Sequence, residues 1–384
     1  MSDLNYVDKL LDGADVEWKA LGKALVRTKG TNITAGRMKE LHKDHAPLKI
    51  FAGGKTIAFV DFKDIPEKNI NREPSIIVKS RGVVEFEYYN NPFSHKNEMW
   101  SYHSKNNNIN IKYVYYYLKT KELYFQGLAS RMQMPQIATP DTDKFPIPIP
   151  PINVQSEIVR ILDAFTELTA ELTAELVLRK QQYDYYRKQL FVFNESQVEL
   201  KLLGDVTVYE QPTKYRVNSK EYNDDFVTPV LTAGKTFILG YTNEVEGIYE
   251  ASKTPVIIFD DFTTANKWVD FDFKVKSSAM KMITSLDESV VMQKFIYYWL
   301  NTLPSELVDG DHKRHWISNF AKKEIPVPPL AEQQRIVAIL DKFDTLTTSL
   351  TEGLPREIEL RQQQYEYYRE LLLSFPKAEV ADHD

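Results

Sequence analysis

Two short stretches contain residue types used in phosphate and nuclease chemistry, and both are incomplete. Residues 233–236 read AGKT, like the end of a phosphate-binding loop. Such a loop needs a second glycine five positions before Gly234, and this position is occupied by Pro229. Residues 311–313 read DHK, which could supply half of a nuclease carboxylate–lysine set, and no partner aspartate in a supporting context precedes them. We therefore predict neither a nucleotide-binding loop nor a nuclease centre.

Two further stretches approach the signatures of an amino-methyltransferase. FAGG (51–54) is close to the signature for the methyl donor, and NNPF (90–93) to that for the target base. Neither is complete and neither recurs elsewhere in the chain, so turns are the better interpretation. The seven histidines show no metal-ligand spacing and there is no cysteine, so we expect no metal and no cofactor on this chain. The sequence predicts a non-catalytic protein.

Composition limits the partners and the compartment. No apolar run approaches the roughly 20 residues that span a bilayer, and the first residues do not resemble a signal peptide, so we expect a cytoplasmic protein. The net charge is −6, but residues 1–146 carry +5 and residues 196–324 carry −4. Positive charge that could meet a polyanion is thus concentrated in the first segment.

An internal repeat is the strongest pattern in the chain. IPIPP at 147–151 recurs as IPVPP at 325–329, and RKQQYDYYRKQL at 179–190 recurs as RQQQYEYYRELL at 361–372. The first pair is 178 residues apart and the second 182, so the second copy carries four extra residues, which fall around Gly353. We expect a pseudo-twofold repeat whose two chain ends lie near each other.

The repeated segments are expected to be long helices that position the rest of the chain. Apolar residues recur with a helical period from 153 to about 191, which predicts a helix roughly 58 Å long. Its second copy, 331–373, should be kinked at Gly353 and Pro355, because proline lacks the N–H and clashes with the preceding turn. Two such helices with matching apolar stripes favour an antiparallel coiled coil.

The remaining segments read as two mixed α/β lobes. Residues 74–78, 83–89 and 255–259 predict strands, and 111–120 and 293–302 predict amphipathic helices. The predicted fold class is α+β, with two globular domains separated by two long antiparallel helices. The expected domain boundaries are 1–145, 146–195, 196–324 and 325–384.

The doubled element resembles that of a known family. PIPIPPINVQSEIVRILDAF (146–165) and EIPVPPLAEQQRIVAILDKF (324–343) resemble the specificity subunit of type I restriction-modification enzymes, and TAELTAEL (169–176) resembles its IC group. The resemblance implies that each lobe is a target recognition domain reading one half of a bipartite, asymmetric DNA site. It also implies two methylation subunits that bring S-adenosylmethionine, and restriction subunits that bring ATP and Mg²⁺.

The tandem TAEL units can then be interpreted as a helical spacer, called the ruler below, that sets the distance between the two half-sites. Four residues lengthen a helix by about 6 Å, against about 3.4 Å per base pair, so one unit should change the unread spacer by one or two base pairs. The residues that define this ruler are Thr169, Leu172, Thr173 and Leu176.

Candidate contact residues follow from polar loops and from the chemistry of DNA. In the first lobe we expect phosphate contacts from Lys55, Lys79, Arg81, Lys96, Lys105 and Arg131, and base contacts from Gln133 and Gln136. In the second lobe we expect contacts from Lys235, Thr263, Thr264, Asn266, Lys267, Lys313 and Arg314. The pair Asp260 and Asp261 should orient a basic neighbour or cap a turn rather than bind metal, and it could also accept a hydrogen bond from a cytosine amino group. Methylation subunits are expected to dock near Gln155, Gln181, Gln182, Gln333, Gln363 and Gln364.

Two other functions stay open at this level. A structural adaptor could join partner proteins through the coiled coil without reading sequence. A self-sufficient methyltransferase or nuclease is disfavoured by the incomplete motifs. The sequence does not state the bases read or the spacer length.

Overall fold

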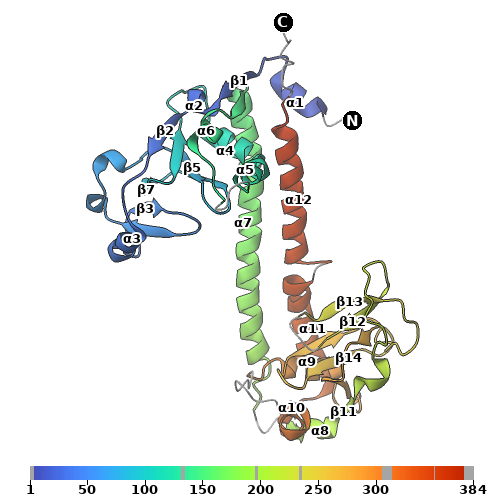
Figure 1. The fold of residues 1–384 in the computed structure, drawn as a ribbon. Helices are drawn as coiled ribbons and strands as arrows, with labels where there is room; N and C mark the ends of the chain where they lie inside the picture. The colour runs from blue at the N-terminus through green and yellow to red at the C-terminus, as the bar shows by residue number, and fades with distance from the viewer. Residues whose placement is uncertain are drawn as a thin grey trace. The chain divides into compact units, whose positions relative to one another are not determined.

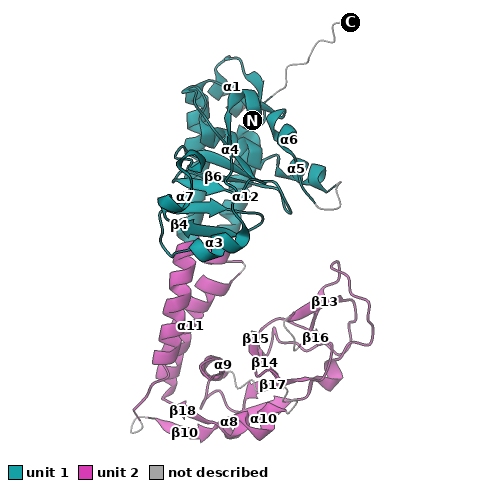
Figure 2. Ribbon diagram, turned by 60° about the vertical axis from the view of Figure 1, so that its left-hand side comes forward, with its two compact units in different colours: residues 1–172, 358–384 teal, residues 173–357 magenta. Residues whose placement is uncertain are grey.

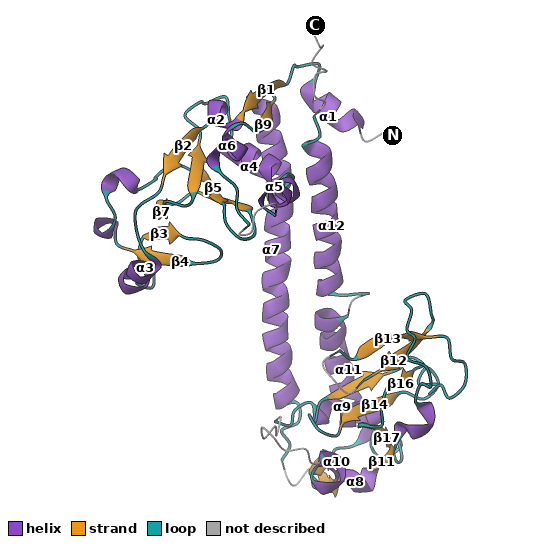
Figure 3. Cartoon of the chain, in the orientation of Figure 1, coloured by secondary structure: helices purple, strands orange, loops and turns teal. Residues whose placement is uncertain are grey.

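The computed structural model describes residues 4–130, 135–194, 198–232, 236–304, 314–349 and 351–375. These divide into two compact units, residues 1–172 with 358–384 and residues 173–357 (Figure 2). Each unit contains one mixed lobe and one pair of helical segments (Figure 1). Strands form the interior of each lobe and helices lie around them (Figure 3).

The lobe of the first unit contains two sheets. The four-stranded antiparallel sheet has the order β2 (Val26–Lys29), β8 (Trp100–His103), β5 (Ser75–Lys79) and β6 (Glu85–Tyr89). The three-stranded sheet has the order β4 (Ile57–Val60), β3 (Leu48–Phe51) and β7 (Phe93–His95), with β3 and β7 parallel. A ribbon of β1 (Glu17–Ala20) and β9 (Pro146–Ile149) joins the lobe to the long helix. The short helices of this unit are α1 (Leu4–Leu11), α2 (Leu21–Ala24), α3 (Ala35–Leu41), η1 (Phe62–Asp64), η2 (Glu67–Asn69), α4 (Ile111–Lys119), α5 (Glu122–Ala129) and α6 (Thr139–Asp143).

The second unit repeats this topology strand for strand. Its four-stranded sheet has the order β11 (Thr207–Glu210), β17 (Met280–Ser285), β14 (Val256–Asp260) and β15 (Asn266–Val269). Its three-stranded sheet has the order β13 (Ile238–Thr242), β12 (Thr228–Leu231) and β16 (Lys274–Val275), and its ribbon pairs β10 (Glu199–Leu202) with β18 (Glu324–Val327). The short helices are α8 (Leu203–Val206), η3 (Pro212–Tyr215), α9 (Gln293–Leu300), α10 (His315–Ser318) and η4 (Phe320–Lys322).

The central strands read as continuous apolar runs because both of their faces are buried. In β5, Ile76 and Val78 belong to the core that includes α4, whereas Ile77 packs with Phe51 and Phe93 of the other sheet. Alternate residues of a strand point to opposite faces, so one run of three apolar residues supplies two cores. In the second unit β14 behaves in the same way, with its residues divided between two clusters. The strands expected at 74–78, 83–89 and 255–259 are confirmed.

Long helical segments pair within each unit. In the first unit, Phe165 of α7 (Ile152–Gln189) stacks on Tyr368 of α12 (Leu354–Leu372) with ring centroids 5.3 Å apart. In the second unit, Phe343 of α11 (Leu330–Thr348) stacks on Tyr183 and Tyr186 of α7, at 5.9 and 5.7 Å. The beginning of α7 shares a core with the end of α12, so that pair is antiparallel. The expected α+β fold with paired antiparallel helices is confirmed.

The second long element is broken rather than kinked. Helix α11 ends at Thr348 and α12 begins at Leu354, with Pro355 in its first turn, where a missing N–H costs nothing. Gly353 has φ +82°, and a Cβ there would lie 2.4 Å from the carbonyl oxygen of Thr345. The sequence located the interruption, but the helical path ends at Thr348, where Ser349 is extended, and starts again directly after the left-handed Gly353.

Segments from both chain ends share the core of the first unit. Val7 of α1 packs in the same cluster as Leu372, Leu373 and Phe375, which follow or end α12. Each of these three lies 182 residues after Leu190, Phe191 or Phe193, which pack against the core of the second unit. The expected proximity of the two ends is thus confirmed for the described residues.

Candidate nucleic-acid interface and docking surfaces

One aspartate on each long helix anchors a lobe to it. Tyr116 of α4 donates a hydrogen bond of 2.5 Å to Asp163, and the Lys112 ammonium lies 2.7 Å from the same carboxylate. In the second unit Tyr298 donates to Asp341, with the Lys294 ammonium 3.2 Å away.

Burial, together with the hydrogen bond to the aspartate, raises the pKa of both tyrosine hydroxyls, so both remain protonated donors. Each anchor fixes the lobe's α4 or α9 helix against a long helix, and thereby sets where the lobe's surface points.

A buried glutamine forms a second repeated clamp. Gln155 is 0% exposed, accepts a hydrogen bond from the amide of Asn110 at 2.9 Å, and donates to the carbonyls of Asn108 and Pro150 at 3.0 and 2.7 Å. Gln333 is also 0% exposed and bonds Met292, Val290 and Pro328 in the same pattern. The expectation that these two glutamines face a docking partner is corrected: their amides satisfy backbone groups inside each unit.

Several candidate contacts of the first lobe are exposed. Lys55 lies in the turn between β3 and β4, which is the turn expected for FAGG, and Lys105 follows β8. Arg81 is exposed and pairs through its backbone with Gln136 in an isolated bridge. The candidates Arg131 and Gln133 lie outside the described residues.

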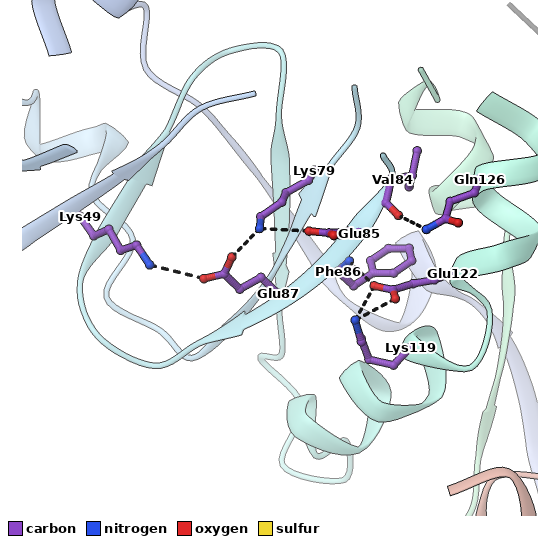
Figure 4. Close-up of polar contacts among 9 residues, drawn as sticks. All are labelled: Lys49, Lys79, Val84, Glu85, Phe86, Glu87, Lys119, Glu122 and Gln126. Atoms are coloured by element: carbon purple, nitrogen blue, oxygen red, sulfur yellow. Dashed lines mark hydrogen bonds and ion pairs between the residues drawn. The ribbon is translucent and has the colours of Figure 1, made fainter. Parts of the chain in front are cut away.

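Two other candidates of this lobe are engaged by carboxylates. The Lys79 ammonium lies 2.9 Å from Glu87 and 3.3 Å from Glu85, and Glu87 also faces Lys49 at 3.4 Å (Figure 4). Lys96 pairs with Glu98 at 2.7 Å.

The same view shows how β6 is tied to its neighbours. Glu122 of α5 accepts a hydrogen bond from the amide of Phe86 at 2.8 Å, and Gln126 donates to the carbonyl of Val84 (Figure 4). Because Lys79 is paired with Glu85 and Glu87, it belongs to an internal charge network on β5 and β6. It offers less to a phosphate than the exposed Lys55 does.

In the second lobe two aspartates organise the candidate loop. Asp260 accepts hydrogen bonds from the hydroxyl of Thr263 at 2.6 Å and from the amide of Phe262 at 2.9 Å. Thr264 is buried with φ +60°, and its amide bonds the Asp260 carbonyl. Asp261 accepts from the amide of Trp316 at 2.9 Å and faces Lys281 at 3.7 Å. The expected capping and orienting role of this acidic pair is confirmed.

The remaining candidates of this lobe lie on β15 and beside α10. Asn266 accepts a hydrogen bond from the amide group of Asn301 at 3.0 Å, while Lys267 and Arg314 are exposed. Thr263 is exposed next to them, whereas buried Thr264 shapes the turn. The candidates Lys235 and Lys313, and with them most of the AGKT and DHK stretches, lie outside the described residues.

The helix faces expected to bind partners recur in both units. Gln181 is exposed, and Gln182 accepts a hydrogen bond from Arg179 at 2.8 Å. In α12, Gln363 and Gln364 are exposed, and Gln364 accepts from Arg361 at 2.7 Å. The ruler residues lie within α7: Thr173 is exposed, and Thr169, Leu172 and Leu176 are half-buried.

Sequence reasoning missed a polar cavity in the first lobe. It has a volume of about 510 Å³ and is lined by the ends of β2 and β8, by β7 and by the segment 67–73. These four segments are far apart in sequence and form no motif, so only the strand pairing brings them together. Among the described residues no group of His, Asp and Glu side chains could hold a metal ion, and no helix is long and apolar enough to cross a membrane.

The lobe, the helix pair and the Asp–Tyr–Lys anchor each occur twice, which defines a duplicated protein with two similar halves. A known protein family matches both halves. The type I restriction modification DNA specificity domain matches this chain twice, over residues 30–178 and 195–360, and the chain belongs to this family. Each match covers most or all of one lobe and much of the helical segment that follows it.

Individual proteins that are similar to this chain are also described as type I specificity subunits. The chain is 32% identical over 392 residues to a putative type I restriction enzyme specificity subunit of Haemophilus influenzae, covering 96% of this chain and 98% of that protein. It is 62% identical over 191 residues to the type I restriction enzyme EcoR124I/EcoR124II specificity subunit of Escherichia coli, a match that spans 48% of this chain and 46% of the relative. Its fold is similar to the crystal structure of a type I restriction-modification system S subunit from M. genitalium, with a TM-score of 0.64, 16% identity, and coverage of 95% and 98%.

Proposed function

We propose that this chain is the DNA sequence-specificity subunit of a type I restriction-modification complex, in which each lobe reads one half of a bipartite, asymmetric site. The observation that carries the proposal is that one scaffold, with the same strand order and the same Asp–Tyr–Lys anchor, occurs twice with different polar loops. Equal scaffolds with unequal surfaces suit two dissimilar half-sites.

The chain contributes recognition rather than catalysis in this proposal. S-adenosylmethionine belongs to the methylation subunits, and ATP and Mg²⁺ to restriction subunits where these are present. The complex acts on double-stranded DNA in the cytoplasm. The exposed cations Lys55, Arg81 and Lys105 would meet phosphates of one half-site, and Lys267 and Arg314 those of the other.

Two methylation subunits would dock on two equivalent helix surfaces. Gln181 and Gln182 on α7 recur as Gln363 and Gln364 on α12, each set with an arginine–glutamine hydrogen bond of the same spacing. A similar surface presented twice suits two copies of one partner. Because residues 196–324 carry −4, such partners would also supply part of the affinity for DNA.

The α7 segment that carries the TAEL units would set the unread spacer. Deleting residues 173–176 shortens the helix by about 6 Å, so the spacer should shrink by one or two base pairs. The matched control Thr173→Ala keeps the length of the helix and should keep the spacer.

One experiment tests both statements. The chain is co-expressed with its cognate methylation subunit, and modified positions are mapped across the genome by sequencing. A bipartite site whose two halves are unrelated in sequence supports the proposal, and an unchanged spacer in the deletion defeats the ruler. Equal binding of random and target duplex by the assembled complex would instead favour a structural adaptor that reads no sequence.

A further inference from the structure

The cavity in the first lobe contains polar groups that nothing in the described structure satisfies. The hydroxyl of Ser94 and the Nδ1 atom of His103 are buried without a hydrogen-bond partner among the described residues. Both residues line the cavity, and both side chains are more than nine-tenths buried. An unsatisfied buried polar group costs about 1–3 kcal/mol, so a lobe that keeps two of them beside one cavity is suited to a polar ligand.

The second lobe has larger side chains at the two equivalent strand positions. Ser94 follows Phe93, which pairs with Asn71, and Lys274 follows Phe273, which pairs with Tyr249. Lys274 is 2% exposed, with its ammonium 3.0 Å from Glu244 and donating to the carbonyl of Glu246.

Tyr249 is the second of these larger side chains. Its ring lies tilted against Phe273, with centroids 5.2 Å apart, and meets Tyr215 edge-on at 5.1 Å. A lysine and a tyrosine thus stand in one lobe at the two positions that a serine and an asparagine hold in the other.

The lining favours a base over a phosphate. The lining has three cations, Lys29, Lys68 and Arg72, and two carboxylates, Glu67 and Glu73, with Arg72 held by Glu67 at 2.8 Å. A phosphate site would exclude such carboxylates, whereas a base edge offers both donors and acceptors to hydroxyl, imidazole and amide groups. A phosphate contact would also be expected in both lobes, because phosphates carry no sequence information.

We propose that this cavity is a specificity pocket that takes the edge of one base of the half-site read by the first lobe, with Ser94 and His103 as reading groups. The proposal rests on the proposed function and adds which part of this lobe discriminates. Lys105, two residues after His103, is exposed and available to hold the DNA backbone.

Two variants test the pocket in the complex with the cognate methylation subunit. Ser94→Ala removes one unsatisfied hydroxyl, so Tm should not fall, while discrimination at one base of the first half-site should drop about three- to ten-fold, the loss of one hydrogen bond. Asn71→Tyr introduces the ring that stands at this position in the second lobe, and should lower discrimination at the same base by at least as much. Ser156→Ala, an exposed serine of α7, is the matched control and should change neither quantity.

The outcomes separate the pocket from the function as a whole. A wild-type complex that methylates no bipartite site would overturn the proposed function. A wild-type bipartite site that both variants read with undiminished discrimination would overturn the pocket alone. The base assignment also fails if affinity falls equally for all sequences with a weaker salt dependence, because that marks a phosphate contact, or if Ser94→Ala lowers Tm, because that marks a structural hydroxyl.

Discussion

Replacing the buried glutamines with leucine should destabilise the lobes without removing a docking surface. Gln155→Leu leaves the amide of Asn110 and the carbonyls of Asn108 and Pro150 without their partner. Each orphaned group costs up to about 1–3 kcal/mol, and water can reach some of them, so we expect a loss of about 3 kcal/mol in the free energy of unfolding. For a unit of this size that lowers Tm by roughly 6–12 °C.

The repeat supplies both a replicate and a control. Gln333→Leu should have the same effect in the second unit, because Gln333 makes the same three bonds. Gln181→Leu changes an exposed side chain and should stay within about 0.5 kcal/mol of wild type.

Calorimetry gives the global loss, and hydrogen exchange gives the local one. The amides of Asn110 and Met292 should exchange slowly in wild type and faster only in the variant of their own unit. Unchanged Tm and protection, combined with weaker association with the methylation subunit, would refute this reasoning and restore a docking role for both residues.

Three further substitutions follow from the contacts. Asp163→Asn should cost about 1–3 kcal/mol, because it weakens bonds from Tyr116 and Lys112, and Asp341→Asn should match it within error in chemical denaturation. Gly353→Ala places a Cβ against the Thr345 carbonyl at positive φ and should lower the free energy of unfolding by more than about 1 kcal/mol. Gly127→Ala, in α5 with open space around it, should instead raise it by up to about 1 kcal/mol. Equal effects of the two substitutions in thermal melts would contradict the packing argument. Lys55→Ala should weaken binding of the assembled complex to DNA and reduce its salt slope by about one, while Lys79→Ala, paired with Glu85 and Glu87, should leave the slope unchanged in titrations at several salt concentrations.

The sequence by itself determined the architecture of this protein. Periodicity and repetition are local or self-referential signals, so the long helix, the paired lobes, the place of the interruption near Gly353 and the strands at 74–78 and 255–259 could all be predicted, although a kink was expected where the helix ends. The acidic pair Asp260 and Asp261 was also interpreted correctly, because a short carboxylate beside its own loop commonly caps it.

Only the tertiary structure decided which polar residues are available to a partner. Gln155 and Gln181 look alike in sequence, yet one is enclosed by backbone groups of the distant residues 108–110 and of Pro150, and the other faces solvent. Lys79 is paired across two strands, and the cavity beside Ser94 forms where strand pairing brings β7 and the ends of β2 and β8 together with residues 67–73. Such contacts depend on residues far away along the chain, and no local period or spacing encodes them.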